Sequence, residues 1–133
     1  MKLTVRSEYA LLALIHLSRQ DPKDFISVEN IAKIHGIPPK FLEQILLILK
    51  RSKYLRSSRG QRGGYALAKP PDEISLAEVI RLFDGALAPT ESSSKYFYEH
   101  TPIEKEGKLI KVFKEIRNYI SERLENITLA DMC

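Results

Sequence analysis

Cysteine and long apolar runs are scarce in this sequence of 133 residues. The single cysteine, Cys133, excludes a disulfide within the chain. No apolar run reaches the roughly 18 residues that a membrane-spanning helix requires. Near the N-terminus, Arg6, Ser7 and Glu8 interrupt the apolar stretch, and no small-residue cleavage site of a signal peptide follows. These absences predict a cytoplasmic protein that does not associate with membranes.

A recognisable catalytic set is also missing. The three histidines, His16, His35 and His100, lie in unrelated sequence contexts. No Ser/His/Asp, Cys/His or paired-carboxylate arrangement can be assembled from the sequence. Apolar residues make up 44% and charged residues 29%, which is typical of one globular domain. The sequence therefore predicts a single-domain protein that is not an enzyme.

Acidic residues are absent between Glu43 and Asp72, which leaves a patch of charge of one sign. Residues 50–69 contain seven cations and no anion, namely Lys50, Arg51, Lys53, Arg56, Arg59, Arg62 and Lys69. The net charge of the chain is +4, so the remainder carries −3. A run of positive charges without anions favours a polyanionic partner, most often nucleic acid. The alternative is a solvated surface, although such surfaces usually mix both signs.

Residues 27–51 have the pattern of two helices joined at a tight corner. Ser27 is suited to cap the first helix, and Gly36 to end it in a left-handed conformation. Pro38 and Pro39 suit the first turn of the second helix, where a missing N–H costs nothing. Apolar residues occupy positions that a helix-turn-helix packs inward, namely Ile31, Ile37, Leu42 and Ile45. A plain helical corner is the alternative interpretation.

The inner face of that second helix is predicted to carry Phe41, Leu42, Ile45, Leu46, Ile48 and Leu49. Next comes "RSSRGQRGGYALAKP", in which two short runs flank the glycine-rich turn "RGQRG". This pattern predicts a β-hairpin attached to the helix-turn-helix, which is called a wing. A tip built from glycine can carry Arg59 and Arg62 into a groove of nucleic acid, where negative potential is concentrated. A flexible exposed loop is the alternative.

The remaining segments predict three further helices around a long loop. The first helix extends from about Val5 to Arg19 with Thr4 as its N-cap, and another follows the capping box of Ser75 and Glu78. Residues 86–101 show no periodicity, whereas residues 103–126 form the longest helix. That helix has an apolar stripe suited to a partner helix, made of Leu109, Phe113, Ile116, Ile120 and Leu124. Covering its own domain is the alternative role, and part of the helix is expected to do so. After it, "TLAD" indicates a short terminal helix that can stand only by docking.

Taken together, the segments "LTVRSEYALLAL", "IAKIHGIPPKFLEQIL", "SRGQRGGYALAKPPDEISLAEVI" and "NITLADM" resemble the Rrf2 family. This family of bacterial winged helix-turn-helix regulators includes the iron–sulfur cluster regulator and the nitric-oxide and cysteine-metabolism repressors. The resemblance covers nearly the whole chain. It implies a mostly α-helical fold with a small wing, a homodimer with crossing long helices, and binding to partly palindromic double-stranded operator DNA. It divides the chain into a DNA-binding domain (1–85), a sensor-type loop (86–101), and a dimerisation helix with a terminal helix (102–133).

The resemblance also places individual residues against DNA. Carried over by position, the residues facing the major groove are Pro39, Lys40, Glu43 and Gln44, and Arg59 enters the minor groove. The chemistry agrees, because glutamate can accept from cytosine, glutamine can pair with adenine, and lysine can contact guanine or a phosphate. Phosphate contacts are expected from Lys50, Arg51, Lys53 and Arg62, and Tyr65 of the "RGxxGGY" segment completes the candidate DNA-binding set.

One departure from the family concerns the loop before the long helix. Members that bind a cluster carry three cysteines there, whereas this chain has Ser92, Tyr98 and Glu104 near the corresponding places. We therefore expect a regulator without an iron–sulfur cluster or any other cofactor. Its expected role is that of a repressor, although the sequence itself leaves the choice between activator and repressor open. His100 together with Glu91, Glu99 or Glu104 remains a possible metal site from the sequence alone.

What the regulator senses is open at this point. The signal is a small-molecule effector, a protein partner, or nothing beyond DNA binding by the dimer. The aromatic segment "KYFYEH" is a candidate contact surface for such a partner. An alternative function is a winged-helix module for protein–protein interaction, in which DNA binding is weak or lost.

Overall fold

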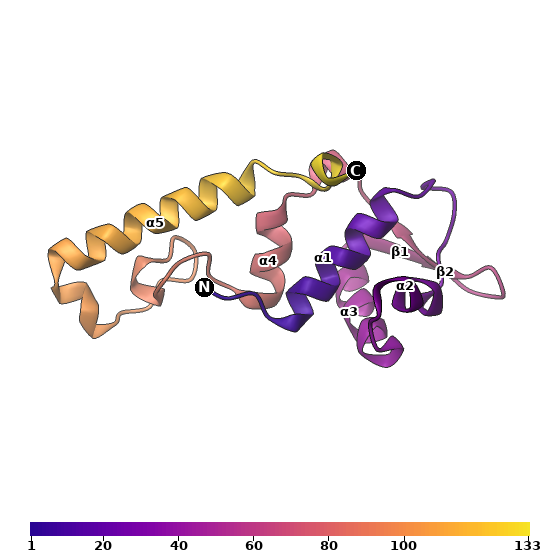
Figure 1. Ribbon diagram of the computed structural model, residues 1–133, viewed down its shortest axis with the longest axis horizontal. Coiled ribbons are helices and arrows are strands. Elements are labelled where there is room, and N and C mark those ends of the chain that lie inside the picture. Colours follow the sequence, from indigo (N-terminus) through magenta and orange to yellow (C-terminus); the bar gives the residue numbers. More distant parts are fainter.

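The computed structural model describes residues 1–133 as an elongated, mostly helical molecule (Figure 1). The principal helices and strands are α1 (Val5–Ser18), α2 (Val28–His35), α3 (Pro39–Arg51), β1 (Leu55–Ser58), β2 (Gly64–Leu67), α4 (Leu76–Asp84) and α5 (Gly107–Glu125). Short 3-10 helices are η1 (Pro71–Glu73), η2 (Glu91–Ser93), η3 (Pro102–Lys105) and η4 (Leu129–Met132). In Figure 1 the β1–β2 hairpin lies at one end of the molecule, and α5 extends toward the other. None of the helices is long and apolar enough to cross a membrane.

The helix boundaries follow from local capping, as the sequence predicts. The hydroxyl of Ser27 accepts a hydrogen bond from the N–H of Asn30 at 3.1 Å and begins α2. Gly36 adopts φ 66° and ends α2, which produces the corner before α3. At α4, Ser75 and Glu78 form a capping box.

Helices α1, α2 and α3 and the hairpin enclose the main core. It contains sixteen buried residues, and α3 contributes Leu42, Ile45, Leu46 and Leu49. The predicted inner face of α3 was wrong for Phe41, which is 36% exposed and packs edge-on against Tyr9 at 5.6 Å between ring centroids. The four buried positions already fill the inward stripe of α3, so Phe41 lies at its side.

The last third of the chain differs from the predicted single helix over 103–126. η3 comes first, and α5 begins only at Gly107, because Glu106 has extended backbone (ψ 90°). The C-terminal part of α5 packs on its own chain, where Ile120 and Leu124 contact the small core cluster of α4. η4 docks as expected, since Leu129 is fully buried and its N–H donates to the carbonyl of Ile74.

Candidate nucleic-acid interface

The exposed face of α3 lies opposite the core and carries the candidate base-reading residues. Pro39, Lys40, Glu43 and Gln44 are all exposed. Their spacing along α3 places the last three on one side of the helix, away from the buried leucines. Burial raises the pKa of the Tyr65 hydroxyl, and the charge of Glu43 adds to this effect. Helix α3 packs against β1, so the helix and the wing are neighbours in the fold.

The wing is a hairpin in which Leu55 pairs with Leu67 and Ser58 pairs with Gly64. A third segment joins it through two backbone hydrogen bonds between Ile26 and Tyr65, at 2.9 and 2.8 Å. A side chain at Gly64 would run into the backbone of Ile26, so only glycine permits this approach. The wing is thus fastened to the segment before α2, and this feature was not predicted from the sequence.

The seven cations of residues 50–69 fall into two groups in the structure. Arg56 is held internally: its guanidinium donates to the carbonyls of Pro22 and Leu67 and lies 4.8 Å from the ring centroid of Phe25. Lys69 lies over the ring of Tyr54 at 4.9 Å. The other five are exposed and form no ion pair or side-chain hydrogen bond, namely Lys50, Arg51, Lys53, Arg59 and Arg62. We call these five residues the free cations.

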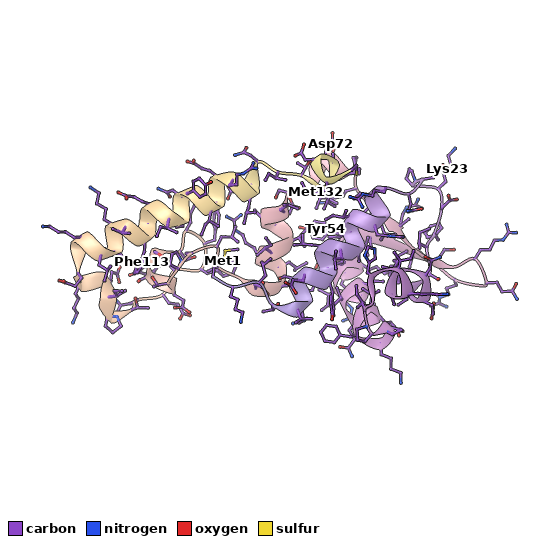
Figure 2. The ribbon with its side chains drawn as sticks, in the orientation of Figure 1. Met1, Lys23, Tyr54, Asp72, Phe113 and Met132 are labelled. Atoms are coloured by element: carbon purple, nitrogen blue, oxygen red, sulfur yellow. The ribbon has the colours of Figure 1, made fainter.

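The free cations lie at two places in the fold. Lys50, Arg51 and Lys53 lie at the C-terminal end of α3, whereas Arg59 and Arg62 lie in the turn of the wing. Figure 2 shows nitrogen-tipped side chains reaching from the wing into solvent. Cations with no protein partner suit contacts with phosphate.

Lys53 has an unusual backbone conformation at the end of α3. Its φ is 68°, and it is the one residue other than glycine with positive φ. The N–H of Lys53 donates to the carbonyl of Lys50, and the N–H of Tyr54 donates to the carbonyl of Leu49. These are the two hydrogen bonds of a Schellman motif, in which the left-handed position is usually glycine. A lysine in this conformation is strained.

The predicted stripe on α5 is divided between two faces. Ile120 and Leu124 face the α4 cluster, and Phe113 is half-buried. The apolar residues that remain exposed are spaced by three, four and three residues along α5, with exposed fractions of 41% to 72%; they are Leu109, Val112, Ile116 and Tyr119. Sequence reasoning missed Val112 and Tyr119, although this spacing is itself a helical signal. We call these four residues the α5 stripe.

The loop before α5 is closed by hydrogen bonds between side chains. The hydroxyls of Ser92 and Thr101 lie 2.5 Å apart. The hydroxyl of Tyr98 donates to Glu104 at 2.7 Å, and Nδ1 of His100 lies 2.6 Å from the same carboxylate. The hydrogen bond from Tyr98, followed by that from His100, lowers the pKa of Glu104. His100 and Glu104 do come together, but no group of three His, Cys, Asp or Glu forms around them.

A helix-turn-helix, a wing hydrogen-bonded to the segment before α2 and five free cations define a winged-helix DNA-binding protein. The Rrf2 family, described as iron-dependent transcriptional regulators, matches residues 3–133. The chain belongs to this family, whose members are DNA-binding transcriptional regulators and not enzymes.

Individual relatives agree with this assignment. An rrf2-like HTH-type transcriptional regulator of Rhodobacter capsulatus is 35% identical over 98% of this chain and 91% of its own length. The structure of CymR, the global cysteine regulator of Bacillus subtilis, matches with a TM-score of 0.78 at 26% identity, covering 99% of this chain and 95% of CymR. The structure of IscR from T. potens matches with a TM-score of 0.75 at 29% identity, covering 99% and 85% of the two chains.

The family description raises the question of iron, and the loop does not fit an iron–sulfur cluster. Such clusters are held mainly by cysteine thiolates, and the single thiol of this chain, Cys133, lies in the C-terminal segment beside Ser18. In the loop, the Ser92 hydroxyl is buried and already bonded to Thr101. The loop therefore offers hydroxyl oxygens that already form hydrogen bonds, and it lacks the thiolates that would hold a cluster.

Proposed function

We propose that this chain is a homodimeric repressor that binds a partly palindromic operator and works without an iron–sulfur cluster. The observation that carries the proposal is the set of exposed free cations at the C-terminal end of α3 and in the turn of the wing, together with the exposed polar face of α3. Such a protein acts in the cytoplasm, where the bacterial chromosome lies. It represses by occupying the operator, and DNA binding does not depend on iron.

In this proposal α3 lies in the major groove. Lys40, Glu43 and Gln44 then reach base edges, and Pro39 begins the helix close to the backbone of DNA. Tyr65, in β2 of the wing and partly buried against the core, is the remaining candidate for a contact with the same DNA segment. Lys50, Arg51 and Lys53 at one side and Arg62 at the other contact phosphates, while Arg59 enters the minor groove.

The division of the chain follows from these roles. Residues 1–85 form the DNA-binding part, residues 86–101 the sensor-type loop, and residues 102–133 carry the dimerisation helix. The α5 stripe faces a second copy of the chain, because four exposed apolar side chains in line on one helix suit a partner helix. A dimer of this kind places two α3 helices on half-sites about one helical turn apart, or a multiple of it.

The test is selection of bound fragments from the host genome, followed by affinity measurements on the selected operator at several salt concentrations. We expect a two-fold symmetric site, and affinity that falls steeply as salt rises because phosphate contacts release counterions. Arg59→Ala should weaken binding strongly. Lys105→Ala, which removes an exposed cation in η3, is the matched control and should change little. A protein that binds no duplex even in dilute salt refutes the proposal.

The proposed absence of an iron–sulfur cluster is tested separately. Protein purified without oxygen should be colourless in the visible range, and an iron chelator should leave its affinity for the operator unchanged. A brown protein with the absorption of a cluster would contradict this part of the proposal and leave DNA binding intact.

A further inference from the structure

The exposed face of α3 carries an apolar side chain in its middle, Leu47. Its side chain is 38% exposed. It follows Gln44 by three residues and Glu43 by four, and it precedes Arg51 by four. Because residues three and four apart share one face of a helix, Leu47 lies in the row of polar residues that faces away from the core.

Leu47 is not one of the residues with which α3 fills the core. The inward side of α3 is occupied by Leu42, Ile45, Leu46 and Leu49, which are buried. Leu47 itself is not among the sixteen buried residues of that core, and 38% of its side chain is open to solvent. This exposed part meets whatever occupies the surface next to Glu43 and Gln44.

In the major groove, an apolar side chain has one suitable partner among the base edges. The donors and acceptors of the bases are polar, and the C5 methyl group of thymine is the apolar group displayed there. A leucine placed against polar edges would remove them from water without hydrogen bonds in return. Against a thymine methyl, both groups gain by leaving water.

We propose that Leu47 is a specificity-determining residue that contacts the methyl group of a thymine in each half-site. This inference rests on the proposed binding of α3 in the major groove. Leu47 lies one helical turn, about 5.4 Å, beyond Glu43 and Gln44. With about 3.4 Å between successive base pairs, the thymine lies one to two base pairs from the base that Gln44 reads.

The experiment replaces each thymine of the selected operator by deoxyuridine, in both half-sites symmetrically. Deoxyuridine lacks the C5 methyl group and keeps every hydrogen bond. For the wild-type protein we expect one thymine per half-site whose replacement lowers affinity by about fourfold for each half-site, the effect of one buried methyl group. For Leu47→Ala the affinity for the thymine operator should fall, and replacing that thymine should have little further effect. Leu47→Met keeps an apolar side chain and should retain the preference.

Matched controls distinguish the loss of a thymine contact from a general loss of protein stability. Leu12→Ala removes a leucine of similar exposure, 39%, from α1, and it should keep the wild-type response to deoxyuridine. Because Leu47 is exposed, Leu47→Ala should unfold at a temperature close to that of the wild type. If wild type and Leu47→Ala respond equally to every replacement, the inference is overturned. The inference is also overturned if no thymine one to two base pairs from the base that Gln44 reads lowers the wild-type affinity when it is replaced. A wild-type protein that binds no duplex at all overturns the proposed function instead.

Discussion

At the scale of single residues, Lys53 shows a conflict between backbone conformation and charge. Left-handed backbone disfavours a residue with a Cβ atom, and the Schellman hydrogen bonds hold Lys53 there. We predict that Lys53→Gly raises the free energy of unfolding by about 0.5 to 1 kcal/mol. The same change should weaken DNA binding and reduce the slope of log affinity against log salt by about 0.9 for each lost phosphate contact, or about 1.8 for a dimer that loses one contact in each half-site. Urea denaturation and DNA titrations measure the two effects. A variant that loses stability, or binds DNA as tightly as wild type, contradicts the prediction.

His16 makes a contact that sequence reasoning did not foresee. Its Nδ1 lies 3.1 Å from Nε2 of His35 at the end of α2, with the rings edge to face. Burial lowers the pKa of His16, and the charges of His35 and Arg19 lower it further. A histidine with a lowered pKa stabilises the fold above its unfolded value of about 6.5 and loses that contribution as the pH falls below it.

We therefore predict that wild-type protein loses more unfolding free energy than His16→Gln between pH 7.5 and pH 5.5. Glutamine keeps a polar side chain and does not titrate, so the difference between the two proteins reports the titration of His16 together with its interaction with His35. Denaturation curves at each pH give the difference directly. Parallel pH profiles of the two proteins would show that His16 does not contribute.

At the scale of elements, the wing depends on Arg56. Its guanidinium joins β1 to the carbonyls of Pro22 and Leu67 and covers Phe25. We predict that Arg56 positions the wing, so that Arg56→Gln weakens DNA binding by displacing Arg59. In a double-mutant cycle, Arg56→Gln should then add little to the loss already caused by Arg59→Ala. Additive losses would mean that Arg56 contacts DNA directly.

The wing also shows what the sequence can and cannot predict. Glycines, alternating residues and the place after α3 are local signals, and they predicted the hairpin correctly. The β-bridge between Ile26 and Tyr65 joins residues far apart in sequence, and no local sequence pattern predicts it. Likewise, a count of cations cannot tell that Arg56 and Lys69 are engaged within the protein. Arg56 and Lys69 differ from the free cations in the protein groups that their side chains contact, and these contacts are seen only in the structure.

At the scale of the whole molecule, the sequence predicted one apolar stripe on the long helix, with part of the helix covering its own domain, but it did not say which residues face which neighbour. In the structure α5 has two apolar faces. One packs on its own chain near the C-terminal end of the helix, and the other is exposed to solvent. Helical periodicity detects apolar positions but does not say which neighbour covers them. The distinction needs the position of α4, whose cluster receives Ile120 and Leu124. The residues for testing dimerisation are therefore those of the α5 stripe.

We predict that Ile116→Asp converts the dimer to a monomer and lowers operator affinity. The carboxylate would lie in the apolar contact between two α5 helices, where burial of an unpaired charge is costly. A monomer binds one half-site at a time and loses the gain of simultaneous contact with both. Asn118→Asp introduces the same charge on an exposed side of α5 outside the α5 stripe, and it should remain dimeric. Sedimentation equilibrium and DNA titrations measure the two effects. If wild-type protein is monomeric at micromolar concentration, or if Ile116→Asp stays dimeric, the α5 stripe is not the interface.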